Sequence, residues 1–140
     1  MEAIAVQKLV ENATIPTRSH ADDAGLDLYA VESFVIEPGQ GKMVATGVAM
    51  EIPQGHVGMI ADRSSLAKKG LKTAGGIVDS GYRGEVKVLI WNLSHQSYSV
   101  SANDRIAQML IIPIVTPQAK QVSDLSKTVR GVGGFGSTGN

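Results

Sequence analysis

Cysteine is absent from this chain of 140 residues. The chain therefore has no disulfide framework and no thiolate metal site, which fits a reducing compartment. An excess of charge is also missing, because 13 basic residues balance 13 acidic ones, so we expect no basic surface for DNA or RNA. Aromatic residues are few, with two Phe, three Tyr and one Trp, which leaves little for stacking on single-stranded nucleic acid. We expect no nucleic-acid partner.

Long apolar runs are absent as well. No stretch reaches the 18 uninterrupted apolar residues of a membrane span, and the start "MEAIAVQKLV" has neither a basic region nor the long apolar region of a secretion signal. We therefore expect a soluble, cytoplasmic protein without a membrane partner. The length favours one domain with a core of its own.

Strand patterns dominate what is present. The segment "KMVATGVAMEIP" alternates apolar and polar residues and predicts one strand with a single buried face. That face comprises Val44, Thr46, Val48, Met50 and Ile52. The segment "GEVKVLIWNLS" is apolar on both faces, with Val86, Val88 and Ile90 on one and Leu89, Trp91 and Leu93 on the other. Such a strand is covered twice, by two layers of one domain or by a neighbouring subunit.

One short helix is expected over Ser64–Gly70, "SSLAKKG", with Gly70 as its cap. Short strands separated by Gly, Pro, Asn and Asp predict an all-β sandwich or barrel. The apolar pattern fades from about Thr116. We expect a core domain at 1–115 and an extended, Gly-rich arm at 116–140.

Familiar catalytic patterns are missing. The three histidines, His20, His56 and His95, lack the spacing of metal ligands, and there is neither a G-x-S-x-G elbow nor a Walker loop. The tail matches the dinucleotide-binding pattern G-x-G-x-x-G at Gly131, Gly133 and Gly136. Only four residues follow, too few for the helix that this site requires.

Two turns carry candidate phosphate-binding or metal-binding groups. In "AGLDLYA", Asp27 lies among apolar residues and is either the outward residue of a strand or a functional carboxylate. In "DRSSLAKKG", Arg63, Ser64 and Ser65 stand where the helix is expected to begin. Such a group suits an anion, although Ser64 or Ser65 could equally be an ordinary helix cap.

Two further segments and the tail complete the candidates. In "GGIVDSGYRGEV", Asp79 ends an apolar run and Tyr82 stands between glycines, where a plain hairpin turn needs no aromatic residue. In "NDRIAQML", Gln108 interrupts an apolar strand, and a buried amide needs a partner in the protein or a ligand. The tail adds Arg130 and Phe135. Together these groups suit a nucleotide polyphosphate with a hard metal ion.

The order of these segments resembles the trimeric all-β dUTPase family. Its five motifs read here "AGLDLYA", "DRSSLAKKG", "GGIVDSGYRGEV", "NDRIAQML" and "RGVGGFGSTG", over Ala24 to Gly139. The resemblance implies a distorted jelly-roll, a sandwich-like barrel with one short helix and a C-terminal arm. It also implies a homotrimer with active sites shared between subunits. The implied activity is that of a dUTP diphosphatase, which limits uracil incorporation into DNA and supplies dUMP for dTMP synthesis.

The resemblance also implies roles for the residues. Asp79 would activate the attacking water and hold the 3'-hydroxyl, and Tyr82 would pack under the sugar. Arg63, Ser64, Ser65 and Gln108 would bind the α- and β-phosphates, and Asp27 would hold Mg²⁺ through water. The hairpin near Gly76 and Ile77 would recognise uracil. Thr73 stands where several members have an Asn that bonds the base, so its contact with uracil stays open.

The C-terminal arm would close over the nucleotide in a site built by other subunits. Phe135 would stack on uracil, and Arg130 and the hydroxyls of Ser137 and Thr138 would bind the γ-phosphate. Gly136 would also belong to the substrate-binding residues. Glycine would give the arm freedom when empty and close approach when closed.

Three rival functions remain in view. A dCTP deaminase shares the fold but carries a catalytic Glu on the strand after the third motif, where this chain has Leu89. A nucleotide sensor without turnover should have lost Asp79 or the arm, and this chain has both. A purely structural trimer would not need Arg63, Tyr82, Gln108 and Phe135 together. Substrate turnover separates these rivals from a hydrolase.

Overall fold

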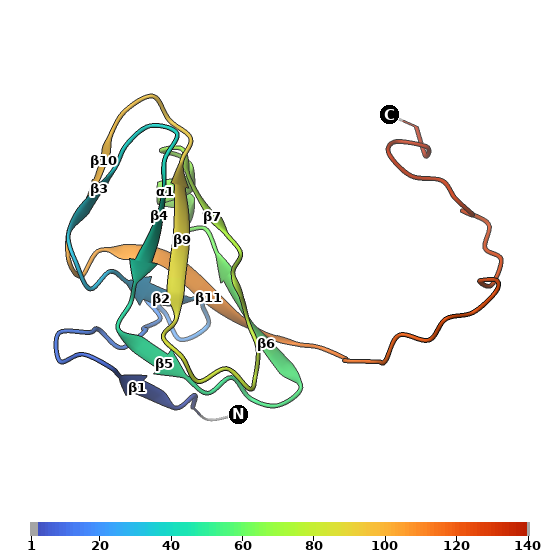
Figure 1. The fold of residues 1–140 in the computed structure, drawn as a ribbon, viewed down its shortest axis with the longest axis horizontal. Coiled ribbons are helices and arrows are strands. Elements are labelled where there is room, and N and C mark those ends of the chain that lie inside the picture. Colours follow the sequence, from blue (N-terminus) through green and yellow to red (C-terminus); the bar gives the residue numbers. More distant parts are fainter. Residues whose placement is uncertain (1–2, 140) are drawn as a thin grey trace.

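The computed structural model describes residues 3–139, and within them it contains eleven β-strands and one short helix (Figure 1). In chain order the elements are β1 (Val6–Lys8), β2 (Leu26–Tyr29), β3 (Phe34–Ile36), β4 (Gly41–Ala45), β5 (Val48–Met50), β6 (His56–Ala61), α1 (Ser64–Ala67), β7 (Leu71–Ala74), β8 (Ile77–Val78), β9 (Lys87–Asn92), β10 (Tyr98–Val100) and β11 (Arg105–Pro113). The expected all-β class is confirmed. Residues 1–2, at the start of the expected core domain, and residue 140, at the end of the expected arm, lie outside the described part.

Antiparallel pairing organises the strands into four sheets. The largest has the order β2-β11-β6-β8, the next has the order β4-β9-β7, and two-stranded sheets join β1 to β5 and β10 to β3. One apolar core fills the space between them, and its fully buried members come from different sheets: Leu28, Ile36, Met50, Val88, Ile90, Ile106 and Met109. The arrangement is that of a jelly-roll, and across residues 3–139 the sheets do not close into a continuous barrel.

The segment expected as one strand over Val44–Ile52 forms two strands instead. All five residues of the expected inner face are buried, as the alternation predicts. The strand nevertheless breaks after Ala45, because Gly47 has a left-handed φ of 69° and donates its N–H to Glu85 Oε1 at 2.9 Å. The chain thereby leaves β9, the partner of β4, and joins β1, the partner of β5.

Strand β9 is covered on one face only within this chain. Val88 and Ile90 are buried in the core, as is Val86 just before the strand. On the other face Trp91 is 41% exposed and Leu93, just after the strand, is 65% exposed. The second cover that the sequence predicts therefore does not come from the described part of this chain.

Helix α1 is shorter than the expected Ser64–Gly70, although Gly70 does adopt a left-handed φ of 85° after it. The helix begins after Arg63, which takes the N-cap position without any side-chain cap hydrogen bond. The interpretation of Ser64 or Ser65 as an N-cap is therefore wrong. Both serine residues are exposed, so their hydroxyl groups face solvent rather than serving the helix.

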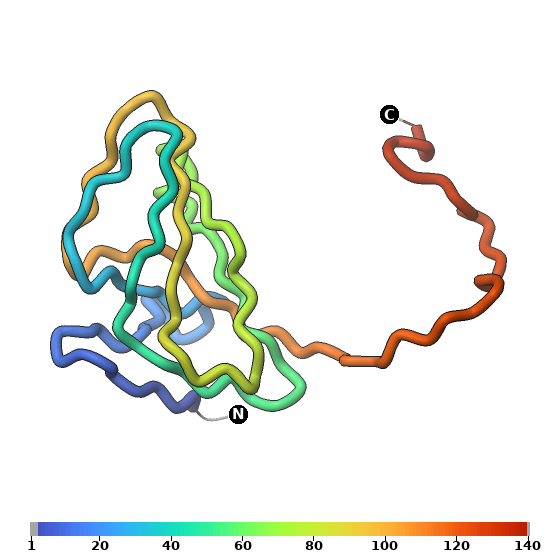
Figure 2. The backbone as a smooth tube through the Cα atoms, viewed as in Figure 1, coloured from blue at the N-terminus to red at the C-terminus, as the bar shows by residue number. Residues whose placement is uncertain are grey.

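After Pro113 the chain runs as an arm without helix or strand up to Gly139. The arm leads away from the sheets and ends far from them (Figures 1 and 2). Its apolar side chains are exposed, including Val122, Leu125 and Phe135. Residues 3–139 contain no helix with the length and hydropathy that a membrane span requires.

Candidate active site

A polar cavity of about 270 Å³ lies where β2, β6 and β11 meet the start of α1. Its lining includes five of the residues expected at phosphate or metal, namely Asp27, Arg63, Ser64, Ser65 and Gln108, together with Ser19, Asp23, Ala24 and Gly25. Strands β2 and β6 both pair with β11, so this sheet brings the first, second and fourth motifs together.

Asp27 is the half-buried carboxylate of this cavity, with 13% of its side chain exposed. Its Oδ1 accepts from Arg63 Nε at 3.1 Å, and its Oδ2 lies 3.4 Å from an Arg105 guanidinium nitrogen. The interpretation of Asp27 as a plain outward strand residue is therefore wrong, because it lines a cavity and is bound by two guanidinium groups. A second carboxylate at the rim, Asp23, accepts the His20 N–H at 2.9 Å, which holds the pKa of Asp23 below its usual range.

Gln108 is held from two sides. Its Nε2 donates to the main-chain oxygen of Asp62 at 2.8 Å, and its Oε1 lies against Gly25, where an added Cβ would come within 2.0 Å of that oxygen. A primary amide carries two N–H groups. One is used on Asp62, and the other is left for a ligand in the cavity that Gln108 lines.

A second cavity of about 320 Å³ lies beside the β8 hairpin. It is lined by four of the residues expected at nucleoside, Gly76, Ile77, Asp79 and Tyr82, and by Met43, Ile60, Val78, Glu85, Val86 and Lys87. Tyr82 donates its hydroxyl hydrogen to the main-chain oxygen of Glu85 at 2.9 Å, which fixes the ring across the turn. A Cβ at Gly84 would lie 2.5 Å from the Tyr82 hydroxyl oxygen, so the glycine leaves room for the ring.

Asp79 and Arg63, the proposed base and a proposed phosphate donor, lie far apart along β6. Val78 pairs with Gly58, so the antiparallel register places Asp79 beside Val57. Arg63 stands six positions after Val57, which corresponds to about 20 Å of extended strand. A base and a phosphate donor that act on one phosphorus must both lie within hydrogen-bonding reach of it or of its water. Asp79 and Arg63 of the same chain do not meet that condition.

Thr73 lies outside both cavity linings. Its N–H and its hydroxyl both donate to Asp62 Oδ1, at 2.7 and 2.6 Å. Asp62 also accepts from Lys72 Nζ at 2.7 Å. Burial alone would raise the pKa of Asp62, but the hydrogen bonds from Lys72 and Thr73 outweigh it and lower that pKa. Sequence reasoning missed this carboxylate, although it directly precedes Arg63.

Two cavity residues that sequence reasoning also missed are Glu85 and Lys87. Glu85 lies at the end of the third motif and Lys87 begins β9, and alternation alone gave no sign that they face a cavity. On the arm, Arg130 bonds the Gly133 oxygen at 2.9 Å. Phe135 is fully exposed and has a left-handed φ of 50°. The structure thus leaves all the expected arm residues, with Gly136, Ser137 and Thr138, away from both cavities.

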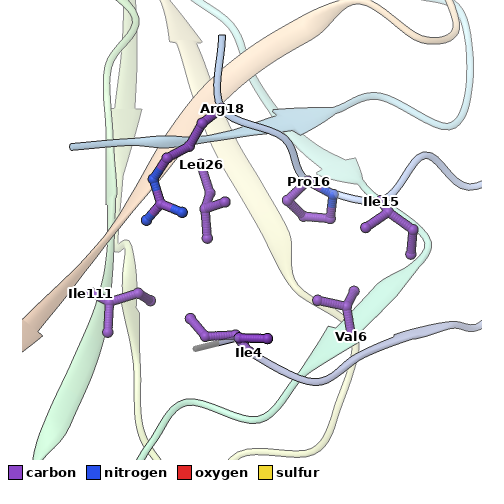
Figure 3. A pocket seen from close by; sticks show the side chains of 8 residues that line it. Ile4, Val6, Ile15, Pro16, Arg18, Leu26 and Ile111 are labelled. Atoms are coloured by element: carbon purple, nitrogen blue, oxygen red, sulfur yellow. The ribbon is translucent and has the colours of Figure 1, made fainter. Parts of the chain in front are cut away.

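A third cavity of about 220 Å³ has a different character. Figure 3 shows the side chains of Ile4, Val6, Ile15, Pro16, Leu26 and Ile111 around it, with Arg18 as the charged member. A single guanidinium group among apolar side chains offers neither a base nor a nucleophile. This cavity is therefore not a candidate for catalysis.

The sequence profile of the dUTPase family matches residues 11–139. This chain belongs to the dUTPase family. Its class as an enzyme is accordingly that of a dUTP diphosphatase. It is 45% identical to the deoxyuridine 5'-triphosphate nucleotidohydrolase of Paramecium bursaria Chlorella virus 1, over 99% of both chains. It is 46% identical to a probable enzyme of the same name from Schizosaccharomyces pombe, over 96% of both chains.

Solved dUTPase structures have the same fold. A point mutant of the dUTPase of Staphylococcus bacteriophage 80alpha, solved with dUpNHpp, is 32% identical with a TM-score of 0.94 and full coverage of both chains. A point mutant of the dUTPase from phage phi11 of S. aureus, whose structure reveals the coordination of a structural Mg(II) ion, is 32% identical with a TM-score of 0.81. That comparison covers 87% of this chain and 97% of the phage chain. The expected family and fold are confirmed.

A magnesium site built from this dUTPase chain alone does not fit the structure. Among residues 3–139 no three His, Cys, Asp or Glu side chains are grouped as metal ligands. Mg²⁺ prefers oxygen ligands and keeps several waters when substrate phosphates complete its shell. One carboxylate, Asp27, beside the hydroxyls of Ser64 and Ser65 fits a magnesium ion that reaches the protein through water and is held mainly by a triphosphate.

Proposed function

We propose that this dUTPase hydrolyses dUTP to dUMP and pyrophosphate by attack of water on the α-phosphorus. One observation carries the proposal. The chain offers a solvent-exposed carboxylate, Asp79, in a cavity of nucleoside size, and a separate polar cavity with phosphate donors. The family match supports dUTP as the nucleotide.

Asp79 is the general base of the proposed reaction. Its carboxylate accepts a proton as the water oxygen forms a bond to the α-phosphorus, and the bond from that phosphorus to the bridging oxygen breaks. Pyrophosphate then leaves with the electron pair of that bond. The same carboxylate accepts a hydrogen bond from the 3'-hydroxyl, which positions the sugar.

The nucleoside occupies the cavity beside the β8 hairpin. Tyr82 packs under the deoxyribose, where a ribose 2'-hydroxyl would clash, and its bond to Glu85 keeps the ring in place. Backbone groups near Gly76 and Ile77 recognise uracil. Thr73 can offer the base only an acceptor oxygen, because its hydroxyl hydrogen is donated to Asp62.

The α- and β-phosphates are bound by Arg63, Ser64, Ser65 and the free N–H of Gln108, donors that stabilise the negative charge of the transition state. Asp27 would hold magnesium through water. When bound, magnesium supplies positive charge to the phosphate oxygens.

The working enzyme is a homotrimer whose sites are shared between copies. The distance of about 20 Å along β6 between Asp79 and Arg63 supports this, because a second copy can bring its phosphate cavity to the first copy's Asp79. The open apolar face of β9, with Trp91 and Leu93, supports burial against a further copy. The arm, with Gly136 among its substrate-binding residues, closes the site: Phe135 stacks on uracil, and Arg130, Ser137 and Thr138 bind the γ-phosphate.

The cell would use this activity to keep uracil out of DNA and to supply dUMP for dTMP synthesis. The absence of cysteine agrees with the reducing cytoplasm in which we place the enzyme.

The test is pyrophosphate release with magnesium from dUTP, UTP, dTTP and dCTP. Release from dUTP alone is the expected result, since the Tyr82 ring excludes UTP and the hairpin excludes the other bases. Binding of dUTP without release would make the protein a nucleotide sensor. Conversion of dCTP to a uracil nucleotide would make it a deaminase, although Leu89, a hydrocarbon on β9, lies outside the lining of the nucleoside cavity.

A further inference from the structure

Asp62 joins three parts of the protein that carry proposed site residues. It follows β6, directly precedes Arg63, and takes its contacts from β7 and β11. Its carboxylate and its main-chain oxygen are both used. Asp62 itself lines neither cavity of the proposed site, so any part it plays there runs through its neighbours.

The carboxylate of Asp62 links β6 to the chain before β8, at a point where backbone pairing between them has ended. Strand β8 pairs with β6, and the Ile60 N–H donates to the Gly76 oxygen at 2.7 Å. Gly75 and Gly76, with φ of 76° and 78°, then turn the chain away, so β7 pairs with β9 instead. Beyond this turn, Asp62 Oδ1 accepts the Thr73 N–H and hydroxyl. The side chain thus ties β7 of one sheet to the end of β6 in the other.

The main-chain oxygen of Asp62 orients the amide of Gln108. It accepts one Nε2 hydrogen at 2.8 Å, and the contact of Oε1 with Gly25 limits the amide on the opposite side. If the end of β6 shifts, this acceptor shifts with it. The second Nε2 hydrogen then loses its direction into the polar cavity, and Arg63 and Ser64, the next residues along the chain, move too.

We propose that Asp62 is a positioning residue for phosphate binding, holding the turn at Arg63–Ser65 and the Gln108 amide in place through its contacts with Thr73 and Lys72. This proposal rests on the proposed function, because it takes those residues as the phosphate donors. It concerns binding of the phosphates and not of the nucleoside, because Asp62 contacts Gln108 and precedes Arg63 but does not line the nucleoside cavity, whose base Asp79 lies near the start of β6.

The experiment measures two probes by calorimetry on the full-length protein: tripolyphosphate with magnesium for the phosphate cavity, and deoxyuridine for the nucleoside cavity. We expect Asp62→Ala to weaken tripolyphosphate binding about tenfold, the effect of losing one or two charge-assisted hydrogen bonds. Deoxyuridine affinity should stay within about twofold of wild type. Asp62→Asn keeps an acceptor oxygen for Thr73 and should recover most of the loss.

Matched variants separate positioning from general stability. Asp22→Ala removes an exposed carboxylate from the loop before β2 and should change neither probe. Should Asp62→Ala fail to fold, Thr73→Val removes one donor while keeping the backbone N–H and a similar shape, and it should weaken tripolyphosphate binding. Only this probe is used for Thr73→Val, because Thr73 also stands at the proposed uracil contact. Unchanged tripolyphosphate binding in a folded Asp62→Ala or Thr73→Val protein would overturn the proposal. Equal loss of both probes would overturn it as well, because it would reveal a structural role only.

Ser64→Ala, measured in parallel, distinguishes this proposal from the proposed function. If Ser64→Ala weakens tripolyphosphate binding and Asp62→Ala does not, the positioning role fails and the phosphate site stands. If Ser64→Ala and Gln108→Leu both leave binding unchanged, the phosphate assignment itself fails, and the role of Asp62 fails with it.

Discussion

Arg63 donates its Nε hydrogen to Asp27 Oδ1 at 3.1 Å, so the residue proposed for the phosphates is bound to the residue proposed for magnesium. The contact joins β2 to the turn before α1 and leaves Asp27 only 13% exposed. The carboxylate at this position serves two positively charged partners. It orients a guanidinium group by its charge, and the same charge attracts a metal ion through water.

Asp27→Asn tests this double role. An amide keeps an acceptor oxygen for Arg63 but loses the charge that attracts hydrated magnesium. We expect magnesium to increase affinity for dUpNHpp about tenfold less in the variant than in wild type, as calorimetry with and without the ion would report. Asp22→Asn, which changes an exposed carboxylate in the loop before β2, is the control. An unchanged magnesium effect would remove Asp27 from the metal site.

Asp79→Asn separates chemistry from binding. The variant keeps the shape of the side chain and its contact with the 3'-hydroxyl but cannot accept the proton of the attacking water. Turnover of dUTP should fall by about 100-fold or more, the usual scale for loss of a general base, while dUpNHpp affinity stays close to wild type. Steady-state kinetics and calorimetry provide the two measurements. Near-normal turnover would mean that another group activates the water.

Much of the fold could be predicted because buried faces follow simple periods. The alternation from Val44 to Ile52 correctly identified five buried residues, since side-chain direction depends only on local geometry. It could not show that the chain changes sheets at Gly47. That break depends on Glu85, 38 residues away, which accepts the Gly47 N–H.

Sequence reasoning likewise predicted some residues of the candidate site and missed others. Asp27, Arg63 and Gln108 were predicted from chemistry that was out of place in their segments, and the sheet brings them to one cavity. Asp62 carried no such signal, because a charged residue at a turn is ordinary and its partners Lys72 and Thr73 come from a strand assigned to another sheet. The sequence alone also does not reveal how far Asp79 lies from Arg63, because their positions at opposite ends of β6 depend on the pairing of β8 with β6.

Truncation after Thr128 tests the arm. Residues 129–139 make no strand with the core, and Phe135 is fully exposed, so the shortened protein should keep its melting temperature and its assembly. Its dUTP hydrolysis should be nearly lost, because the groups proposed for the γ-phosphate and the uracil stack are removed. The substitution Phe135→Ala, which keeps the arm, should reduce activity less. Full activity after truncation would make the arm a dispensable tail.

The lowered pKa of Asp62 predicts how acid affects stability. The folded-state pKa lies below the unfolded value of about 3.9, so the charged form, facing Lys72, stabilises the fold fully above that value. This contribution is lost as the pH falls through the folded-state pKa. The difference in urea stability between wild type and Asp62→Asn should therefore be largest near pH 7 and shrink below about pH 4. A difference that stays constant across that range would contradict the sign of the shift.

Mixed oligomers test whether sites are shared between copies. Asp79→Asn and Arg63→Ala should each be nearly inactive alone. If one copy supplies Asp79 and another supplies Arg63, a trimer containing both variants has some sites with both residues intact. Random mixing in equal amounts gives that combination at about a quarter of the sites, so co-expressed variants should recover about a quarter of wild-type turnover.

The separation along β6 makes the expected recovery specific to this pair. Asp79 and Arg63 lie about 20 Å apart in one chain, whereas Arg63 and Gln108 line the same cavity. In a mixture of Arg63→Ala and Gln108→Leu chains, every phosphate cavity carries one of the two substitutions. We therefore expect no recovery of turnover from this mixture. Recovery by the first mixture with none by the second would establish that base and phosphate donors come from different copies. Failure of both mixtures, in oligomers verified to contain both variants, would require Asp79 and Arg63 of one chain to act together, which the register of β6 and β8 opposes.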